Sequence, residues 1–332
     1  MSVEYERVCY SDAVVDAYRK LHPEQNDAIE RGKLEWKLRN CPGGPGAVMI
    51  ARSQGEIVGM NAFMPSRFRV GAEQVRAYQS MDTIVTPAAR AKGVFVRLST
   101  LFYESADAAL IYGFPNAHSA PGFFGKLGWT HLSAVPMLVR PLRTGYFARR
   151  VSRFLPDLPL PHLARATQDP GRIERFDERT SALWRRFSAG IDCAVERDAE
   201  FLNWRLVDHP SERYTIVGDG DEAFAAWSVT HKHGARIGYL AEAIGVETAP
   251  LAGLIASALC EMRAAGAELA FAWCLPWSPN YRAYRKAGFY PLPEMLRPIA
   301  IQFGARPLLE PAAAQIATRR GWYISYLDSD TV

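Results

Sequence analysis

The sequence contains one pattern twice, 168 residues apart. Residues 34–42 read L-E-W-K-L-R-N-C-P and residues 202–210 read L-N-W-R-L-V-D-H-P, so their Trp and Pro positions align at one spacing (204 − 36 = 168). The halves also end alike, because residues 124–129 (F-G-K-L-G-W) and 284–289 (Y-R-K-A-G-F) place a Lys and a Gly between two aromatic residues. We therefore expect two similar halves built from the same order of elements.

One segment breaks this symmetry. Residues 85–95 read V-T-P-A-A-R-A-K-G-V-F, whereas residues 244–253 of the second half read I-G-V-E-T-A-P-L-A-G, with an acid in place of the basic turn. This difference predicts that the first half binds a ligand and that the second half has lost it. The second half then either builds part of another pocket or only stabilises the fold.

Length and composition suit two ordinary domains. The chain has 332 residues, of which 48% are hydrophobic and 22% charged, enough for a separate core in each domain. No apolar run approaches the roughly 20 residues needed to cross a bilayer. The acidic start M-S-V-E-Y-E also lacks the basic and apolar regions of a secretory signal. We expect a cytoplasmic protein without stable membrane insertion.

Charge and cysteine content argue against several other classes. A formal net charge of +4 helps to attract anionic small molecules, but a nucleic-acid-binding surface requires a denser basic stripe. The five cysteines are odd in number, far apart and without a C-x-x-C pair, so neither a disulfide framework nor a zinc site is indicated. We expect no metal and no nucleic-acid partner.

The apolar pattern predicts the order of the elements. Residues 47–85 contain three apolar stretches separated by turns, which is typical of an antiparallel meander. After Gly93, one face of a helix about four turns long carries Val94, Leu98, Leu101, Phe102 and Ala109. A buried strand follows over residues 109–114. The second half repeats this order, with strands expected over 214–218, 223–230 and 237–246, a helix over 251–264 and a strand over 269–274.

We predict a mixed α/β fold with domains at residues 1–140 and 171–332, joined by a connector at 141–170. Six prolines from Pro136 to Pro170 favour an ordered but irregular connector rather than helix or sheet. The same region carries basic and aromatic residues: Arg140, Arg143, Tyr146, Phe147, Arg149, Arg150, Val151, Arg153 and Phe154. They predict either a short basic helix that touches a membrane surface or an anionic substrate, or a helix packed between the domains with solvated arginines.

The segment after Val85 has the features of a phosphate-binding loop. A strand, a Pro-led turn and then Arg90-x-x-Gly93 precede a helix, whose first N–H groups lack internal partners and lie at the positive end of its dipole. Gly93 permits close backbone approach, while Arg90 and Lys92 add positive charge. Taken alone, R-x-x-G also fits an ordinary solvated loop.

The order of meander, loop, helix and strand, followed by residues 114–129, resembles the GNAT superfamily of acyl-CoA-dependent N-acyltransferases. The phosphate loop of that family is [Q/R]-x-x-G-x-[G/A], and Phe95 stands where the family usually has Gly or Ala. The wording P-A-A-R-A-K-G-V-F looks most like a subgroup of tandem GNAT proteins, in which a bulky residue at this position is usual. Some of its members acylate nucleotide-linked amino sugars used in surface polysaccharides.

The resemblance implies direct attack of an amine on the thioester of acetyl-CoA or a longer acyl-CoA, without a covalent enzyme intermediate. The strand before the loop would hold the pantetheine and polarise the thioester carbonyl. The residues expected to bind the co-substrate are Thr83, Ile84, Val85, Arg90, Ala91, Lys92, Gly93, Val94, Phe95 and Asn116.

Three residues are candidates for catalysis. Asp82, just before the loop, is the first candidate for the general base, and a solvated or capping carboxylate is its alternative role. His118 is the second candidate base, with a structural role as its alternative. The Tyr that protonates the leaving thiolate in many family members corresponds to Phe124 here, so Ser119 or Tyr103 could substitute, or the thiolate could leave unaided.

The acceptor is less well defined. The resemblance favours a nucleotide-linked amino sugar. The alternatives are another amine, such as an amino acid, a peptide, a lipid precursor or a protein lysine, and a protein that binds acyl-CoA without turnover. Aromatic faces suit a sugar or a base, although they suit a core as well. The candidate acceptor residues are Tyr78, Gln79, Trp273, Trp277, Ser278, Asn280 and Tyr281. We expect a monomer, because tandem duplication can replace a dimer interface.

Overall fold

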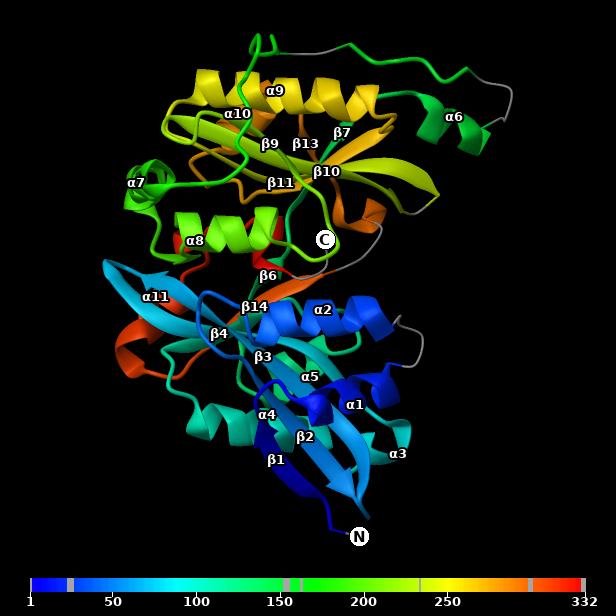
Figure 1. Cartoon of the computed structure of the whole chain (residues 1–332), viewed down its shortest axis with the longest axis vertical. Helices are drawn as coiled ribbons and strands as arrows, with labels where there is room; N and C mark the ends of the chain where they lie inside the picture. The colour runs from blue at the N-terminus through cyan, green and yellow to red at the C-terminus, as the bar shows by residue number, and fades with distance from the viewer. Residues whose placement is uncertain are drawn as a thin grey trace.

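The computed structural model describes residues 2–22, 27–151, 156–161, 164–232, 234–297 and 301–329. Two β-sheets lie one above the other, with helices on their faces (Figure 1). This arrangement confirms the predicted mixed α/β class. The helices are α1 (Asp12–Leu21), α2 (Asp27–Leu38), α3 (Pro87–Arg90), α4 (Val94–Ser105), α5 (Ala120–Lys126), α6 (Gly145–Val151), α7 (Glu178–Phe187), α8 (Ala199–Leu202), α9 (Thr248–Ala264), α10 (Tyr281–Lys286) and α11 (Ala313–Ala317).

The first sheet has the order β1-β2-β3-β4-β5-β14-β6, and β8 pairs with β3. The antiparallel pairs β2–β3 and β3–β4 confirm the predicted meander, and β4 then pairs in parallel with β5. These strands are β1 (Glu4–Val8), β2 (Ala47–Ser53), β3 (Glu56–Val70), β4 (Glu73–Val85), β5 (Leu110–Gly113), β6 (Thr130–Ala134), β8 (Cys193–Val195) and β14 (Gln302–Pro307).

Helix α4 follows the predicted face but is shorter than expected. Val94, Leu98 and Phe102 are fully buried, as the spacing predicts. The prediction for Ala109 was wrong, because α4 ends at Ser105 and the Ala109 N–H donates to the Arg76 carbonyl at 2.9 Å at the entry to β5. The helix therefore returns the chain to the sheet within about three turns.

The second sheet has the order β13-β7-β12-β11-β10-β9 and repeats the meander and parallel crossover of the first. Helix α9 lies along one face of it (Figure 1). The predicted strands and helix of the second half are confirmed, with shifted ends. The strands are β7 (Met137–Pro141), β9 (Thr215–Gly218), β10 (Ala223–Lys232), β11 (Ala235–Gly245), β12 (Leu269–Trp273) and β13 (Tyr290–Pro291).

The two sheets exchange strands. β7 follows the first half in sequence but pairs with β12 and β13, while β14, near the end of the chain, lies between β5 and β6. The sheets therefore do not divide at residues 140 and 171. The expectation of an irregular segment was wrong for residues 137–141, because Pro136 precedes the strand and Pro141 is its last residue, so neither interrupts it.

The connector contains α6, and arginines on and just before this helix bond to neighbouring acids. Arg149 pairs with Glu268 at 2.6 Å and Arg143 with Asp157 at 2.8 Å. These pairs favour the packed helix over the membrane-touching one. The side chains of Phe147, Arg150, Val151, Arg153 and Phe154 lie outside the described residues.

The repeated motifs meet between the sheets. The Trp36 and Trp204 rings stack at a centroid distance of 4.2 Å. Each indole N–H donates to the backbone carbonyl of the other Trp, at 3.0 and 3.2 Å. The repeat thus forms a near-symmetric contact that joins the two halves.

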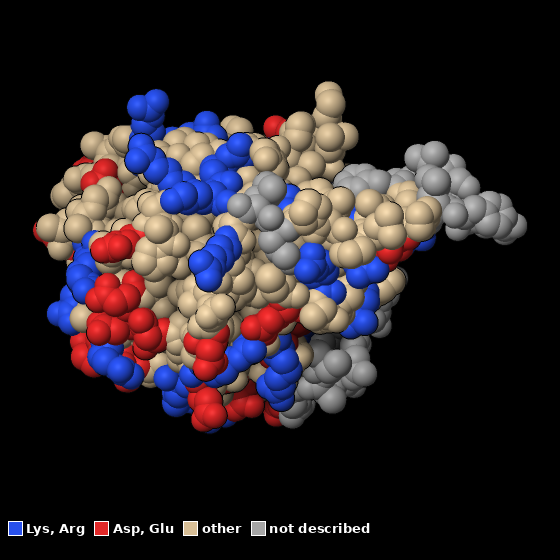
Figure 2. All heavy atoms as spheres, turned by 90° about the horizontal axis from the view of Figure 1, so that it is seen from above, with Lys and Arg blue, Asp and Glu red and all other residues tan. Residues whose placement is uncertain are grey.

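Two further features of the structure are the distribution of charge on its surface and the length of its apolar helices. Seen from the end that carries α9, basic and acidic side chains are interspersed over much of the surface (Figure 2). Among the described helices, none is both long and apolar enough to cross a membrane.

Candidate active site

A cavity opens where β4 and β5 separate. The two strands pair only from Ala77 to Gln79 on β4, opposite Leu110 to Tyr112 on β5. Beyond this point the edge of β4 lacks a neighbouring strand, and a cavity of about 220 Å³ fills the gap. It is lined by Gln79, Ser80, Met81, Asp82, Thr83, Gly113, Phe114, Pro115, Asn116, Ser119, Phe123, Trp129 and Ser329.

A β-bulge turns the end of β4 out of the regular ladder. Met60 pairs with Ile84 and Ala62 with Met81, so Asp82 and Thr83 together face Asn61. Asp82 has φ 47°, a left-handed conformation that is uncommon for a residue with a side chain. The bulge exposes backbone groups of this segment beside the cavity.

Asn61 holds the bulge in place. Its side chain is fully buried, and its Oδ1 accepts hydrogen bonds from Thr83 Oγ1 at 2.8 Å and Ser80 Oγ at 3.2 Å. Its Nδ2 donates to Ser99 Oγ on α4 at 3.0 Å. The sequence interpretation missed this residue, although an Asn within the apolar stretch of β3 is the signal that could have identified it.

The Asp82 carboxylate is a strongly bonded member of the site. Its Oδ2 accepts hydrogen bonds from Lys37 Nζ and Tyr18 Oη, both at 2.6 Å. Burial alone would raise the pKa of Asp82, but the Lys37 ammonium and the hydrogen bonds from Lys37 and Tyr18 outweigh it and lower the pKa. Asp82 is therefore ionised at neutral pH and is a weak proton acceptor.

The predicted phosphate loop lies beside the end of β4. α3 ends at Arg90, residues 91–93 form a turn, and α4 starts at Val94. Arg90 Nε donates to the Val85 carbonyl at 3.1 Å, which ties the loop to the strand. Gly93 has φ 69°, and a Cβ atom there would meet nothing within 4 Å. Ala91, Lys92 and Gly93 are exposed, so the N-terminus of α4 is open to a ligand.

Phe95 has a compensating partner. Its ring makes an edge-to-face contact with Phe123 at 5.0 Å and covers Gly122, where any side chain would clash with it. Phe95 thus packs on α5 and leaves the exposed turn 91–93 clear. This packing accounts for a bulky residue at a position where the family usually has Gly or Ala.

The cavity includes some of the other predicted residues. Asn116 and Ser119 both line it, and Asn116 Oδ1 accepts from the backbone N–H groups of His118 and Ser119 at 3.0 Å. His118 is exposed and is not among the lining residues, so the structure does not bring it to the cavity.

Phe124, at the position of the family's Tyr acid, and Tyr103, a candidate substitute, do not line the cavity. Phe124 packs against His131 and Gly304 rather than lining the cavity. Burial raises the pKa of Tyr103, whose oxygen accepts from Trp129 Nε1 at 3.0 Å. Of the residues considered for the acid, Ser119 is the one that reaches the cavity.

The residues suggested for an acceptor site divide into two groups. Gln79 lines the cavity with 2% of its surface exposed, and its buried Oε1 has no hydrogen-bond partner within the described part of the chain. The other candidates are buried in the core or bonded within it and do not line the cavity: Tyr78, Trp273, Trp277, Ser278, Asn280 and Tyr281.

Comparison with protein families gives a match over the part of the chain that contains this cavity. A family model described as an acetyltransferase (GNAT) domain matches residues 12–132, which include the meander, the bulge and the loop. Residues 12–132 are therefore similar to a GNAT acetyltransferase domain. This similarity supports an acyl-CoA-dependent acyltransferase with acyl-CoA as its co-substrate. No curated protein matches the sequence significantly.

Solved structures show that the matched segment and the second sheet together form a known fold. A protein of unknown function from Enterococcus faecalis V583, described as a "Probable N-Acyltransferase", is 11% identical with a TM-score of 0.61, covering 94% of this chain and 74% of its own. N-myristoyltransferase from Saccharomyces cerevisiae with bound myristoyl-CoA and inhibitors is 14% identical with a TM-score of 0.59 (91% and 80% covered). Eis1 from Mycobacterium abscessus is 14% identical with a TM-score of 0.53 (95% and 76% covered).

Proposed function

We propose that this chain transfers an acyl group from acetyl-CoA or a longer acyl-CoA to a small primary amine, with a nucleotide-linked amino sugar as the acceptor. The observation that carries the proposal is the cavity beside the end of β4, which is followed directly by the open loop at the start of α4. An acyl-CoA spans both features, because its diphosphate suits the loop and its thioester suits the strand end.

The loop residues would bind the diphosphate. Arg90 and Lys92 supply positive charge, the open surroundings of Gly93 permit close approach, and the N–H groups of Val94 and Phe95 supply donors at the positive end of α4. Ala91 completes the turn. These groups form a complementary surface for a flexible, doubly charged group.

The bulged strand would bind the pantetheine and polarise the thioester. Backbone groups of Thr83, Ile84 and Val85 lie on the unpaired edge of β4, and Asn116 lies across the gap. Oriented donors at a developing oxyanion contribute about 3 kcal/mol in comparable sites. Because Asn61 fixes the bulge, it would position these donors.

Direct attack by the amine fits the cavity. None of the described residues that line it is a cysteine, so no thiol nucleophile is at hand. Asp82 would orient the amine and take its proton, which requires an acceptor whose ammonium is itself easily deprotonated, because the Asp82 pKa is low. Amines beside hydroxyl groups meet this condition better than lysine. Ser119 would donate a hydrogen bond to the leaving thiolate.

The second sheet would belong to a tandem GNAT arrangement that has lost its own co-substrate site. The reciprocal Trp36–Trp204 contact supports this view, because it relates the two copies of the repeat across one interface. The second half would then complete the acceptor site.

Calorimetric titration with acetyl-CoA tests the proposal. We expect saturable binding with one site per chain, and release of thiol when an amino sugar nucleotide is added. Absence of acetyl-CoA binding would overturn it, and binding with thiol release on lysine peptides alone would replace the acceptor class.

A further inference from the structure

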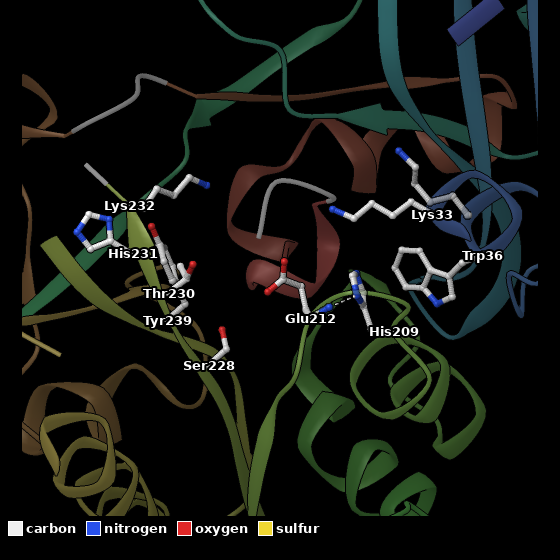
Figure 3. A pocket seen from close by; sticks show the side chains of 10 residues that line it. Lys33, Trp36, His209, Glu212, Ser228, Thr230, His231, Lys232 and Tyr239 are labelled. Atoms are coloured by element: carbon white, nitrogen blue, oxygen red, sulfur yellow. Dashed lines mark hydrogen bonds between the residues drawn. The ribbon is translucent and has the colours of Figure 1, made fainter. Parts of the chain in front are cut away.

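A second hollow lies between the two halves, on the other side of Lys37 from the acyl cavity. It has a volume of about 350 Å³, within the lower range of small-molecule sites. Residues of both halves face it (Figure 3). It is lined by Lys33, Trp36, Lys37, His209, Glu212, Ser228, Thr230, His231, Lys232 and Tyr239, and is called the interdomain cleft below.

The interdomain cleft is cationic. Three lysines line it against one carboxylate, that of Glu212. Lys37 is paired with Asp82, whereas Lys33 forms no ion pair with a carboxylate in the part of the chain that the structure describes. Lys33 comes from α2 in the first half and Lys232 from β10 in the second. An anion between them would be held from both sides.

The pKa of His209 is lowered by burial and by the same positive charges that surround the interdomain cleft. Burial lowers its pKa, and the positive charges of Arg205, Lys33, Arg213 and Lys37 lower it further, to about 3. Its Nδ1 accepts hydrogen bonds from the backbone N–H groups of Ser211 and Glu212, at 3.3 and 2.9 Å. The ring is therefore neutral at physiological pH and carries its proton on Nε2, so it adds a donor and no negative charge.

The interdomain cleft and the acyl cavity share a wall. Lys37 lines the cleft, Asp82 lines the cavity, and the Lys37 Nζ to Asp82 Oδ2 distance is 2.6 Å. A ligand anchored in the cleft can therefore present a group to the end of β4 where the thioester would lie. This continuity relates the cleft to the reaction rather than to an unrelated site.

We propose that the interdomain cleft binds the phosphate-bearing part of the acceptor, held by Lys33 and Lys232, with the amine directed past Lys37 toward Asp82. This inference rests on the proposed function for the role of the amine, but the binding of phosphate can be tested without turnover. Lysine ammonium groups suit phosphate, because charge-assisted hydrogen bonds are about twice as strong as neutral ones. The cleft volume fits a phosphate or diphosphate with part of its ester.

Inorganic pyrophosphate is the first probe, titrated calorimetrically into protein saturated with CoA, so that the loop at residues 90–95 is already filled. We expect one saturable site per chain, weakened at least ten-fold in the double variant Lys33→Gln/Lys232→Gln. The matched control is Lys126→Gln/Lys286→Gln, which removes the same charge from exposed helical positions on α5 and α10 and should bind pyrophosphate as the parent does. No binding, or equal binding by both double variants, would overturn the proposal.

Two further comparisons identify the source of the phosphate and separate the two proposals. Tighter binding of UDP than of pyrophosphate indicates a nucleotide-linked acceptor, whereas equal binding indicates a simple phosphate ester; both support the cleft. With acetyl-CoA, glucosamine 6-phosphate should be a better acceptor than glucosamine, and the lysine variant should reduce that preference. If acetyl-CoA does not bind, the proposed function fails, while pyrophosphate titration of the Gly93→Glu variant, whose loop is blocked, still decides the cleft.

Discussion

The ends of β4 and β11 are corresponding places in the two halves, and they differ in what surrounds a carboxylate. Asp82 on β4 has a side chain that is 22% exposed and lines a cavity. Glu242 on β11 is fully buried and accepts hydrogen bonds from Tyr323 Oη at 2.5 Å, Ser325 Oγ at 2.8 Å and Arg197 Nε at 3.2 Å. The Asp82 carboxylate lines a cavity that a ligand can enter, whereas the Glu242 carboxylate is enclosed by hydrogen bonds within the protein.

The gap beside each strand differs in the same way. β11 also loses its parallel neighbour after Leu240, which pairs with Ala272. There, however, Asn280 Nδ2 donates to the Ala243 carbonyl at 2.7 Å and to Tyr323 Oη at 3.2 Å. The backbone that would meet a pantetheine is occupied by the protein's own side chains. Equal topology therefore does not give equal function.

The largest effect is expected where the closed strand end is broken. In the parent, Arg197 Nη2 lies 2.5 Å from Asp328 Oδ2 and Arg197 Nε lies 3.2 Å from Glu242 Oε2. Arg197→Met therefore leaves both carboxylates buried without their cation. We expect a loss of about 3–5 kcal/mol in the free energy of unfolding, measured by urea denaturation. Arg186→Met is the control, because its pairs with Asp221 and Glu222 are about half exposed and are worth about 0–1 kcal/mol. Equal losses in the two variants would show that the buried network is not structural.

The open strand end is tested through its loop. Gly93→Glu places a carboxylate, in a strained left-handed conformation, where the diphosphate would bind. We expect acetyl-CoA affinity to fall about 100-fold, about 2.7 kcal/mol at 1.36 kcal/mol per factor of ten, in a calorimetric titration. Gly234→Glu is the matched control, since Gly234 has φ 72° and equally open surroundings in the second sheet. Unchanged affinity in Gly93→Glu would remove the loop from the site.

The contribution of the Lys37–Asp82 pair at the open strand end can be tested by measuring the free energy of unfolding as a function of pH. Asp82→Asn leaves Lys37 mostly buried without its carboxylate, and we expect a loss of about 2 kcal/mol in the free energy of unfolding at pH 7. Because the folded-state pKa of Asp82 is lowered, its contribution is complete above the unfolded pKa of about 3.9 and is lost as pH falls through the lower folded value.

Stability curves of the parent and Asp82→Asn should therefore run parallel from pH 7 to about pH 5 and converge at pH values below about 4. Asp198→Asn serves as the control. Asp198 pairs with Arg67 at a partly exposed site, and Arg67 also pairs with Glu200, so Arg67 keeps a carboxylate partner in this variant. A difference between parent and Asp82→Asn that does not change with pH would mean that Asp82 is not the titrating group.

The smallest effect is expected from restoring charge to the second half. Glu247→Arg removes the acid at the start of α9, yet Asn280 and Tyr323 still fill the strand gap. We expect the stoichiometry of acetyl-CoA binding to stay at one per chain in calorimetry. A second site would show that the loop, rather than the filled gap, separates the halves.

Much of the fold was predictable from local pattern. The apolar stretches of residues 47–85 and the apolar face after Gly93 are short-range patterns, and each predicted elements that the structure contains. The repeat at 34–42 and 202–210 predicted a correspondence, because each copy is a short motif that can be compared with the other. The loop proposed to bind phosphate could also be named from the sequence, because an Arg and a Gly before a helix have a physical reason to stand together.

The site was less predictable, because its contacts join residues far apart in the chain. Asp82 could be named from its place before the loop, but its partners Lys37 and Tyr18 are 45 and 64 residues away. His118 has suitable chemistry and a suitable place in the sequence, yet it does not line the cavity beside the end of β4. The role of Asn61 depends on its hydrogen bonds to Ser80 and Thr83 on the neighbouring strand, and Gln79 lines a cavity that forms between two strands.

The sequence by itself predicted two similar halves, a meander in each and one loop suited to phosphate, since each copy of the repeat, each strand and the loop is a pattern within a short stretch of residues. Only the tertiary structure decided that β7 and β14 exchange sheets, that Asn280 and Tyr323 close the second strand end, and that Lys33 and Lys232 face one cleft. The physical reason is that such pairings are selected by the packing of whole sheets, whose free energy is spread over many residues and leaves little trace in any short stretch.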